Sequence, residues 1–195
     1  MFTLVKALTI SFMPSALQPG VLAVGLDEQF HHVVAKQFED REVQKTYLAV
    51  VHGRPDQDEG TIDYSIGPDQ KSAVRLKLAA HRDGSGMPAL THYRVLRGND
   101  RYSLVELRPK TGRTHQLRVH MTAIGCPLVG DKIYGADDAI FLAKVTGELD
   151  EQTLQDLVLP RHALHSSALR FYHPMLDREM VVEAPLPDDM RALVD

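Results

Sequence analysis

The most restrictive feature of this sequence is a series of short apolar runs, rich in β-branched and aromatic residues and separated by turn residues. Such runs are typical of β-strands, and they occur at 20–26, 43–53, 72–80, 89–96 and 100–109. Two more strands around a turn, then a short helix, are expected towards the C-terminus. Because strands outnumber helices and do not alternate regularly with them, we predict an α+β fold built on a mixed, largely antiparallel sheet with flanking helices and loops.

Two segments have a helical period instead. In "DEQFHHVVAKQFEDR" the apolar residues recur at helical spacing, and Asp27 is the expected N-cap. The second helix is expected within 110–125, where Thr111 or Thr114 can cap its start. Its apolar face is expected to consist of Leu117, Met121 and Ile124.

The charge distribution is uneven. The formal net charge is −4, which argues against a generally basic nucleic-acid binder. Between Thr91 and His120, however, seven Lys or Arg and two acidic residues give a net charge of +5, so the rest of the chain carries −9. A local basic patch of this kind can hold a polyanion, although a solvated charged surface would give the same counts.

Hydrogen-bond donors crowd the start of the second helix, just after the strand that ends at Pro109 and the turn at Gly112. These donors are Lys110, Arg113, His115, Gln116 and Arg118. Backbone N–H groups at a helix start add partial positive charge, so the place suits a phosphate or a carboxylate. The alternative is an ordinary surface helix with exposed basic residues.

Three motifs decide between these readings. The string "LRPKTGRTHQLRVHMTAIGCPLVGDKIYG" closely resembles the signature of the RluA-type RNA pseudouridine synthases. "QFEDREVQKTYLAVVHG" resembles a second motif of that family, and "LHSSALRFYHPM" is similar to a third. The resemblance extends from about Gly20 to Ala184.

The resemblance implies an enzyme that isomerises uridine in ribosomal or transfer RNA to pseudouridine without a cofactor or metal. In the family an aspartate is the essential catalytic group, a tyrosine stacks on the extruded base, and an arginine pairs with the aspartate. Tyr47 matches the tyrosine and Arg118 the arginine. Lys45, Lys110, Arg113, His115 and Gln116 are the candidate RNA-binding residues.

The catalytic aspartate has no counterpart in the sequence. The family's loop, H-R-L-D-x-x-T-S-G, directly precedes the strand that "GVLAV" matches. An ungapped alignment places Ser15 at the aspartate position, whereas an alignment with gaps places the lost aspartate between Leu17 and Gln18. The first aspartate in the chain is Asp27. Because a serine hydroxyl is not ionised near neutral pH and needs a base to act as a nucleophile, we expect an inactive or severely impaired chain. We also expect Arg118 to lack its charge partner, which is costly in a buried site.

We therefore divide the chain into an atypical leader, 1–19, and a partial catalytic domain, 20–195, that lacks the family's N-terminal strands. A truncated or frame-shifted copy, or a misassigned start, would explain this division. The alternative function is that of a non-catalytic RNA-binding relative or a degenerate fragment.

The remaining composition suggests a cytoplasmic monomer. The single cysteine, Cys126, excludes an intrachain disulfide and fits a reducing compartment. No apolar run approaches the roughly 20 residues of a membrane helix. His115 and His120 are five residues apart and do not share a helix face, so no metal site is expected.

Overall fold

A computed structural model describes residues 7–10, 19–23, 28–135, 138–148 and 157–195. The strands are β1 (Ala7–Ile10), β2 (Gly20–Ala23), β3 (Gln44–His52), β4 (Glu59–Ile62), β5 (Ser65–Pro68), β6 (Leu78–His81), β7 (Thr91–Gly98), β8 (Tyr102–Pro109), β9 (Leu164–His173) and β10 (Arg178–Glu183). The helices are α1 (Glu28–Glu39), α2 (Gln116–Ala123), α3 (Asp138–Thr146) and α5 (Asp188–Arg191).

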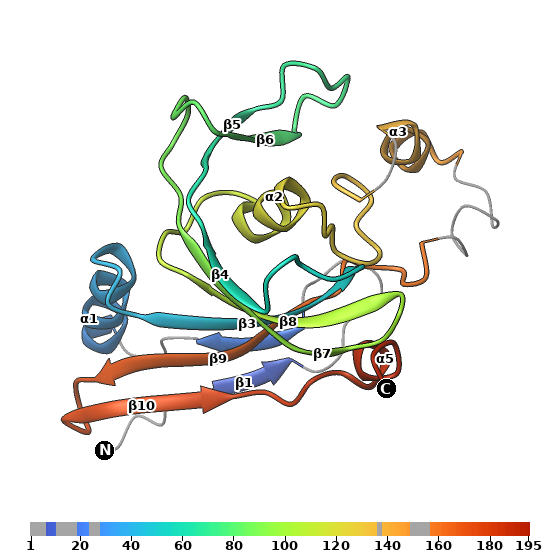
Figure 1. The fold of residues 1–195 in the computed structure, drawn as a ribbon. Helices are drawn as coiled ribbons and strands as arrows, with labels where there is room; N and C mark the ends of the chain where they lie inside the picture. Colours follow the sequence, from blue (N-terminus) through green and yellow to red (C-terminus); the bar gives the residue numbers. More distant parts are fainter. Residues whose placement is uncertain (1–6, 11–18, 24–27, 136–137, 149–156) are drawn as a thin grey trace.

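One large sheet carries the fold, in the order β1-β2-β9-β3-β8-β7-β4, with β10 paired to β9. Every pairing in it is antiparallel except the contact between β2 and β9. The short β5–β6 pair forms a separate sheet, and α2 lies between it and the large sheet (Figure 1). The predicted α+β class with a mixed, largely antiparallel sheet is confirmed.

Ala49, Val50 and Val51, near the end of β3, are all buried. Their side chains point alternately to opposite sides of the sheet, and a cluster packs on each side. Ala49 and Val51 pack in a cluster with Leu117 and Met121 of α2, whereas Val50 packs in another with Met190 of α5. The predicted apolar face of α2 is confirmed, since Ile124 also packs against the first cluster. These contacts fix α2, and hence its N-terminus, above the centre of the sheet.

Helix α1 covers β9 and β10 through Phe30 and Val34, which are buried in a cluster with Phe171. Val33 and Phe38, at the same helical spacing, remain more than a third exposed. The expected N-cap, Asp27, lies outside the described residues.

Some elements differ from the prediction. Only the end of the predicted strand 72–80 is extended, as β6, because the Ser72 hydroxyl and the Lys77 ammonium both bond the Asp138 carboxylate and draw the preceding residues into a loop. Strands β4 and β5 were not predicted. Within the predicted leader, Ala7–Ile10 forms β1, which pairs with β2 at the edge of the sheet.

Candidate active site

The loop between β8 and α2 is held by Gln116, the first residue of α2. Its side-chain carbonyl accepts hydrogen bonds from the Thr111 hydroxyl (2.7 Å) and the Arg113 amide (3.0 Å). Its side-chain amide donates to the Leu90 carbonyl and the Thr91 hydroxyl, both at 3.0 Å. Gln116 lines the site as predicted, but its side chain is already used within the protein, where it fixes the shape of the loop.

The predicted threonine cap of α2 is wrong. The N-cap position is His115, in the left-handed conformation (φ 56°), and it makes no side-chain capping bond. Thr111 instead uses its hydroxyl to accept the Leu90 amide and to donate to Gln116. The tight turn at His115 directs the start of α2 towards β7.

Arg118 forms a buried bidentate ion pair with Asp131. Its Nε lies 2.7 Å from Asp131 Oδ2, and one terminal nitrogen lies 2.6 Å from Oδ1. The Asp131 side chain is 0% exposed and that of Arg118 10%. The expectation that Arg118 lacks a charge partner is therefore wrong, because Asp131 in "GDKIYG" supplies the carboxylate.

Asp131 is held in its ionised form. Burial alone would raise the pKa of its carboxyl group, but the hydrogen bonds and charge of Arg118 outweigh burial and lower that pKa below its ordinary value. The backbone amides of Ile133 and Tyr134 add to this by donating to Oδ1 at 3.0 and 3.1 Å. Charge-assisted, bidentate pairs of this kind are the strong hydrogen bonds of proteins.

Tyr134 connects this ion pair to His115 and to β6. The Arg118 guanidinium carbon lies 4.7 Å from the centre of the Tyr134 ring, and the Tyr134 hydroxyl lies 2.8 Å from His115 Nδ1. The Leu78 amide donates to the same hydroxyl at 3.2 Å. Burial, with a further contribution from the Arg118 charge, lowers the pKa of His115.

A pocket of about 310 Å³ opens beside this network. Most of the predicted site residues line it, namely Lys45, Tyr47, Arg113, His115, Gln116 and Arg118. Tyr47 stands at the centre of the sheet, opposite Leu107 of β8 and Ser166 of β9, directly after an irregularity in the β3–β9 ladder. Burial raises the pKa of the Tyr47 hydroxyl, so this side chain is neutral at physiological pH.

His162 also lines the pocket, and the sequence did not identify it. Burial, with a smaller contribution from the Arg118 charge, lowers the pKa of His162 to about 4. Its position depends on Gly130 (φ 72°), where an added Cβ would lie 2.2 Å from the carbonyl oxygen of Arg161. Gly130 thus allows the segment that carries Asp131 to touch the segment that carries His162.

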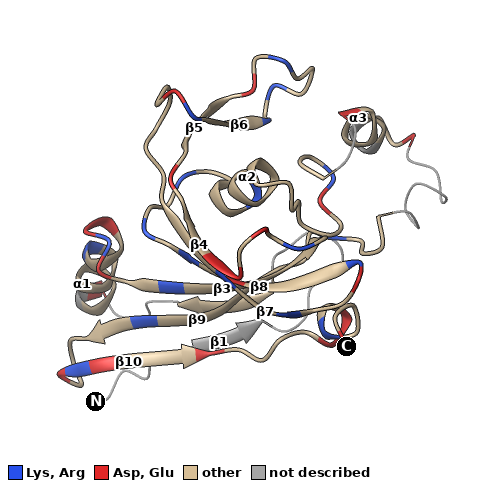
Figure 2. Ribbon diagram, viewed as in Figure 1, with Lys and Arg blue, Asp and Glu red and all other residues tan. Residues whose placement is uncertain are grey.

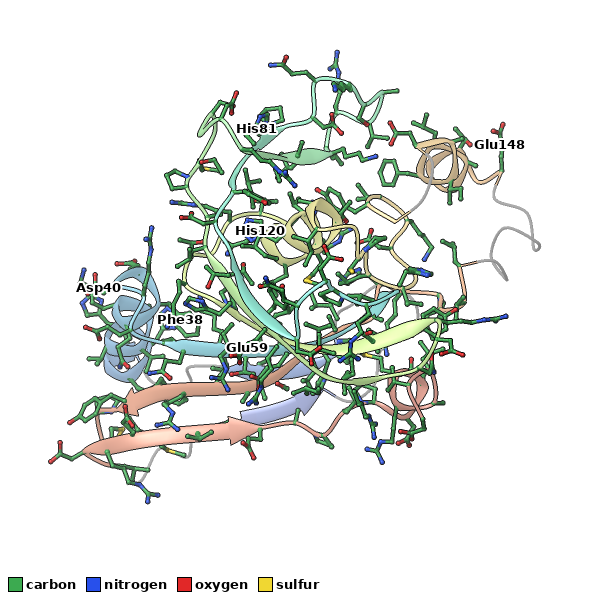
Figure 3. All side chains as sticks on the ribbon, in the orientation of Figure 1. Phe38, Asp40, Glu59, His81, His120 and Glu148 are labelled. Atoms are coloured by element: carbon green, nitrogen blue, oxygen red, sulfur yellow. The ribbon has the colours of Figure 1, made fainter. Side chains whose placement is uncertain are left out.

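A larger groove of about 1050 Å³ adjoins the pocket and shares Lys45 and Arg113 with it. Its charged lining residues are the cations Arg41, Lys45, Arg108, Lys110, Arg113 and Arg170 and the carboxylates Glu39, Glu106 and Glu183, so the lining is basic on balance. Figure 2 shows basic residues on β3 and β9 beside α1. Burial, and to a lesser extent the nearby Arg41, lowers the pKa of Lys45, whose Nζ lies 5.4 Å from the ring centre of Phe38 (labelled on α1 in Figure 3).

The basic stretch from Thr91 to His120 does not form a single patch. Arg94 and Arg108 both pair with Glu106, and Arg97 pairs with Asp195. Lys110 and Arg113 form no ion pair with any described residue, and they lie at the groove. The groove therefore draws only part of its positive charge from this stretch and the rest from Arg41, which follows α1, and from β3 and β9.

The described residues contain no group of three or more His, Cys, Asp or Glu that could hold a metal ion. His120, labelled in Figure 3, is fully buried, and its ring nitrogens lie within hydrogen-bond distance of the Thr91 hydroxyl and the Tyr64 carbonyl. Ser15, at the aspartate position of the ungapped alignment, lies outside the described residues.

Comparison with known proteins identifies the family to which this site belongs. The family model described as RNA pseudouridylate synthase matches residues 19–123. The chain belongs to this family. The match spans α1, β3, β8 and α2, and hence Tyr47 and Arg118. The motif resemblance to its RluA-type members is thereby supported.

Individual relatives agree with this assignment. Over 174 residues the chain is 37% identical to ribosomal large subunit pseudouridine synthase D of Zymomonas mobilis, covering 89% of this chain and 51% of that protein. It is 39% identical over 176 residues to the RNA pseudouridine synthase YlyB of Bacillus subtilis, covering 90% and 51%. The chain thus spans about half the length of the curated relatives it matches.

A solved structure shows the same fold. Human RNA pseudouridylate synthase domain containing 1 superposes with a TM-score of 0.67 at 31% sequence identity, over 86% of this chain and 64% of that one.

Proposed function

We propose that the pocket receives a uridine extruded from RNA and that the chain descends from enzymes that isomerise this uridine to pseudouridine. The observation that carries the proposal is the convergence of Lys45, Tyr47, Arg113 and Arg118 on one pocket beside a basic groove. A base that undergoes chemistry must leave its stack, and an aromatic wall next to a phosphate-binding surface serves that purpose. In this proposal Tyr47 stacks on the base, and the groove cations contact the flanking phosphates.

The pocket suits a base in size and in chemical character. Its volume of about 310 Å³ lies at the lower end of the range of about 300–1,000 Å³ that is usual for small-ligand sites. Tyr47 and Leu164 supply apolar surface, and Arg118 supplies a positive charge near the carbonyl oxygens of a pyrimidine. We propose ribosomal or transfer RNA as the substrate class; the name of the Zymomonas relative favours ribosomal RNA.

We further propose that isomerisation by this chain is absent or severely impaired. None of the described residues that line the pocket is acidic. The carboxylate that pairs with Arg118 is Asp131, which is 0% exposed and has both oxygens engaged. The first 26 residues of the sequence contain no Asp or Glu.

The test is tritium release from RNA labelled at C5 of uridine. We expect little or no release by the natural chain and a clear gain by Ser15→Asp, which restores the carboxylate of the motif. Adding Tyr47→Ala or Arg118→Ala to the restored chain should abolish the gain. Release by the natural chain at the rate of an intact relative would refute the proposed impairment.

A second candidate function is RNA binding without isomerisation. It is favoured by the Arg118–Asp131 ion pair, because Arg118 already has a charge partner and that partner is not a catalytic carboxylate in the pocket. RNA affinity without tritium release, and without a gain in Ser15→Asp, would select this function. Failure to bind RNA would exclude both candidates.

We also propose that the protein acts as a monomer in the cytoplasm. The single cysteine, Cys126, is buried and forms no disulfide, which fits a reducing compartment. None of the described helices has the length and apolarity needed to cross a membrane. Light scattering on the purified chain tests the monomeric state.

A further inference from the structure

We propose that His162 reads the edge of the extruded base and makes the pocket prefer uracil over cytosine. This inference rests on the proposed function, because it assumes that a pyrimidine from RNA enters the pocket. It adds a specificity-determining residue that lies outside the three motifs and that does not depend on the missing aspartate.

Most polar groups around the pocket already have hydrogen-bond partners within the protein. The side chain of Gln116 makes four hydrogen bonds within the protein, and the Thr111 hydroxyl makes two. The Tyr134 hydroxyl lies at hydrogen-bond distance from His115 Nδ1, and Asp131 takes two of the three nitrogens of Arg118. These groups fix the shape of the pocket, and of the nitrogens of Arg118 one terminal nitrogen is not occupied by Asp131 and can still donate to a base.

The imidazole of His162 differs from these groups. It lines the pocket and is partly exposed, and its ring nitrogens make no hydrogen bond to a described residue and are not among the fully buried unpaired atoms. In a concave site, a polar group without a protein partner is the natural contact for a ligand.

A side chain discriminates between two bases only if its position is fixed, and hydrogen bonds hold the backbone around His162. The carbonyl of His162 accepts the Leu164 amide at 2.9 Å, and the next residue, Ala163, donates to the Val129 carbonyl at 2.8 Å and accepts from the Val50 amide at 3.0 Å. The backbone around His162 is therefore tied both to β3 and to the segment before Asp131.

Uracil and cytosine differ in the hydrogen-bonding groups at one edge of the ring. Uracil presents an N3–H donor and an O4 acceptor where cytosine presents an N3 acceptor and an amino donor. Arg118 can only donate, so its charge favours the extra carbonyl of uracil. The neutral imidazole that follows from the low pKa of His162 has a lone pair, and this lone pair can accept the N3–H.

Sites of this kind reject the wrong ligand because its binding leaves a polar group of the site without a hydrogen bond. With cytosine, an amino group faces the Arg118 cation, and the ring nitrogen no longer donates to His162. A single lost hydrogen bond of this kind corresponds to roughly a tenfold change in affinity.

The experiment compares the binding of single-stranded oligouridylate and oligocytidylate of about twelve nucleotides, a length that spans a typical single-strand site. Fluorescence anisotropy at neutral pH gives the two dissociation constants for the natural chain, His162→Gln, His162→Leu and the control His52→Leu. His52 is a matched control because it is also partly buried against an aromatic ring, that of Tyr102, but does not line the pocket.

We expect the natural chain to bind oligouridylate roughly tenfold more tightly than oligocytidylate. His162→Leu should bring this ratio close to one, His162→Gln should keep most of it because the amide oxygen can also accept the N3–H of uracil, and His52→Leu should leave it unchanged. A folded His162→Leu chain that keeps the natural ratio would overturn the inference.

Two further outcomes separate this inference from the proposed function. Binding of both RNAs without preference by the natural chain refutes the role of His162 and leaves RNA binding intact. Absence of binding to either RNA refutes the proposed function and this inference together. If His162→Leu does not fold, nitrogen NMR of the natural chain replaces it: the His162 ring signals should shift on addition of oligouridylate, and unchanged signals contradict the inference.

Discussion

Two sets of side chains around the pocket differ in the hydrogen bonds and ion pairs that they make within the protein. The paired set, Gln116, Arg118, Asp131 and Tyr134, is linked by hydrogen bonds and an ion pair within the protein. The open set, Lys45, Tyr47, Lys110 and His162, makes no side-chain hydrogen bond to any described residue. The paired set gives the pocket its shape, and the open set is available for a ligand.

The largest expected effect comes from breaking the paired set at Asp131. Asp131→Ala leaves the Arg118 guanidinium buried without a counter-charge, so we expect the free energy of unfolding to fall by about 3–5 kcal/mol. The measurement is urea denaturation. Asp58→Ala is the matched control, because Asp58 also pairs with an arginine at 2.6 Å but is 74% exposed, and it should change stability little. Equal losses in the two variants would contradict the distinction between the sets.

The next effect is a pH dependence that originates in the open set. His162 has a folded-state pKa of about 4, below its ordinary value of about 6.5. The unfolded chain therefore binds a proton in this window that the folded chain does not, and stability falls as the pH drops from about 6.5 to 4. A shift of this size corresponds to about 3 kcal/mol.

Urea denaturation at several pH values measures this loss, and His162→Gln should remove about 2 to 3 kcal/mol of it. Burial lowers the pKa of His120 and His165 as well, so part of the pH dependence should persist. The stability that the depressed pKa of Asp131 contributes is lost only at lower pH, as that carboxyl group protonates, so the two windows separate. An unchanged pH profile in His162→Gln would show that His162 is not the source.

The smallest effect on stability is expected at Lys110. Because it has no ion pair among the described residues, Lys110→Ala should leave the unfolding free energy nearly unchanged. It should nevertheless weaken RNA binding and reduce the slope of log affinity against log salt by about one, as expected for one lost phosphate contact. Arg101→Ala is the control, since Arg101 belongs to the same basic stretch but does not line the groove. A salt slope equal to that of the natural chain would place Lys110 outside the RNA interface.

Sequence reasoning located most of the pocket but not its internal pairing. Tyr47 and Arg118 could be placed because each stands in a long motif with strong periodicity, and the structure brings them to one cavity. Asp131 stands in the same motif as Arg118, but the family resemblance places the charge partner of Arg118 in the loop before Gly20. Strands can be recognised locally, whereas an ion pair across a turn depends on how the turn closes.

Other residues carried no usable signal. His162 stands outside any motif, and it is brought to the pocket by the approach of Gly130 to Arg161 together with the hydrogen bonds of Ala163 to Val50 and Val129. Strands β4 and β5 are four residues long and contain Gly or Pro, so their sequences favour a turn, and pairing with β7 and β6 is what makes them extended. The hydroxyl of Thr111 could not be distinguished from a helix cap, because its partners, Leu90 just before β7 and Gln116 of α2, come together only in the folded protein.

Gly130 influences the pocket although it has no side chain that could contact a ligand. It touches neither the base nor the phosphates in the proposed complex, yet the absence of its side chain sets the separation between the segment that carries Asp131, the partner of Arg118, and the segment that carries His162. A methyl group added there would push these two segments apart. We expect such a variant to have a larger cavity that discriminates less between bases, although every residue that contacts the base is unchanged.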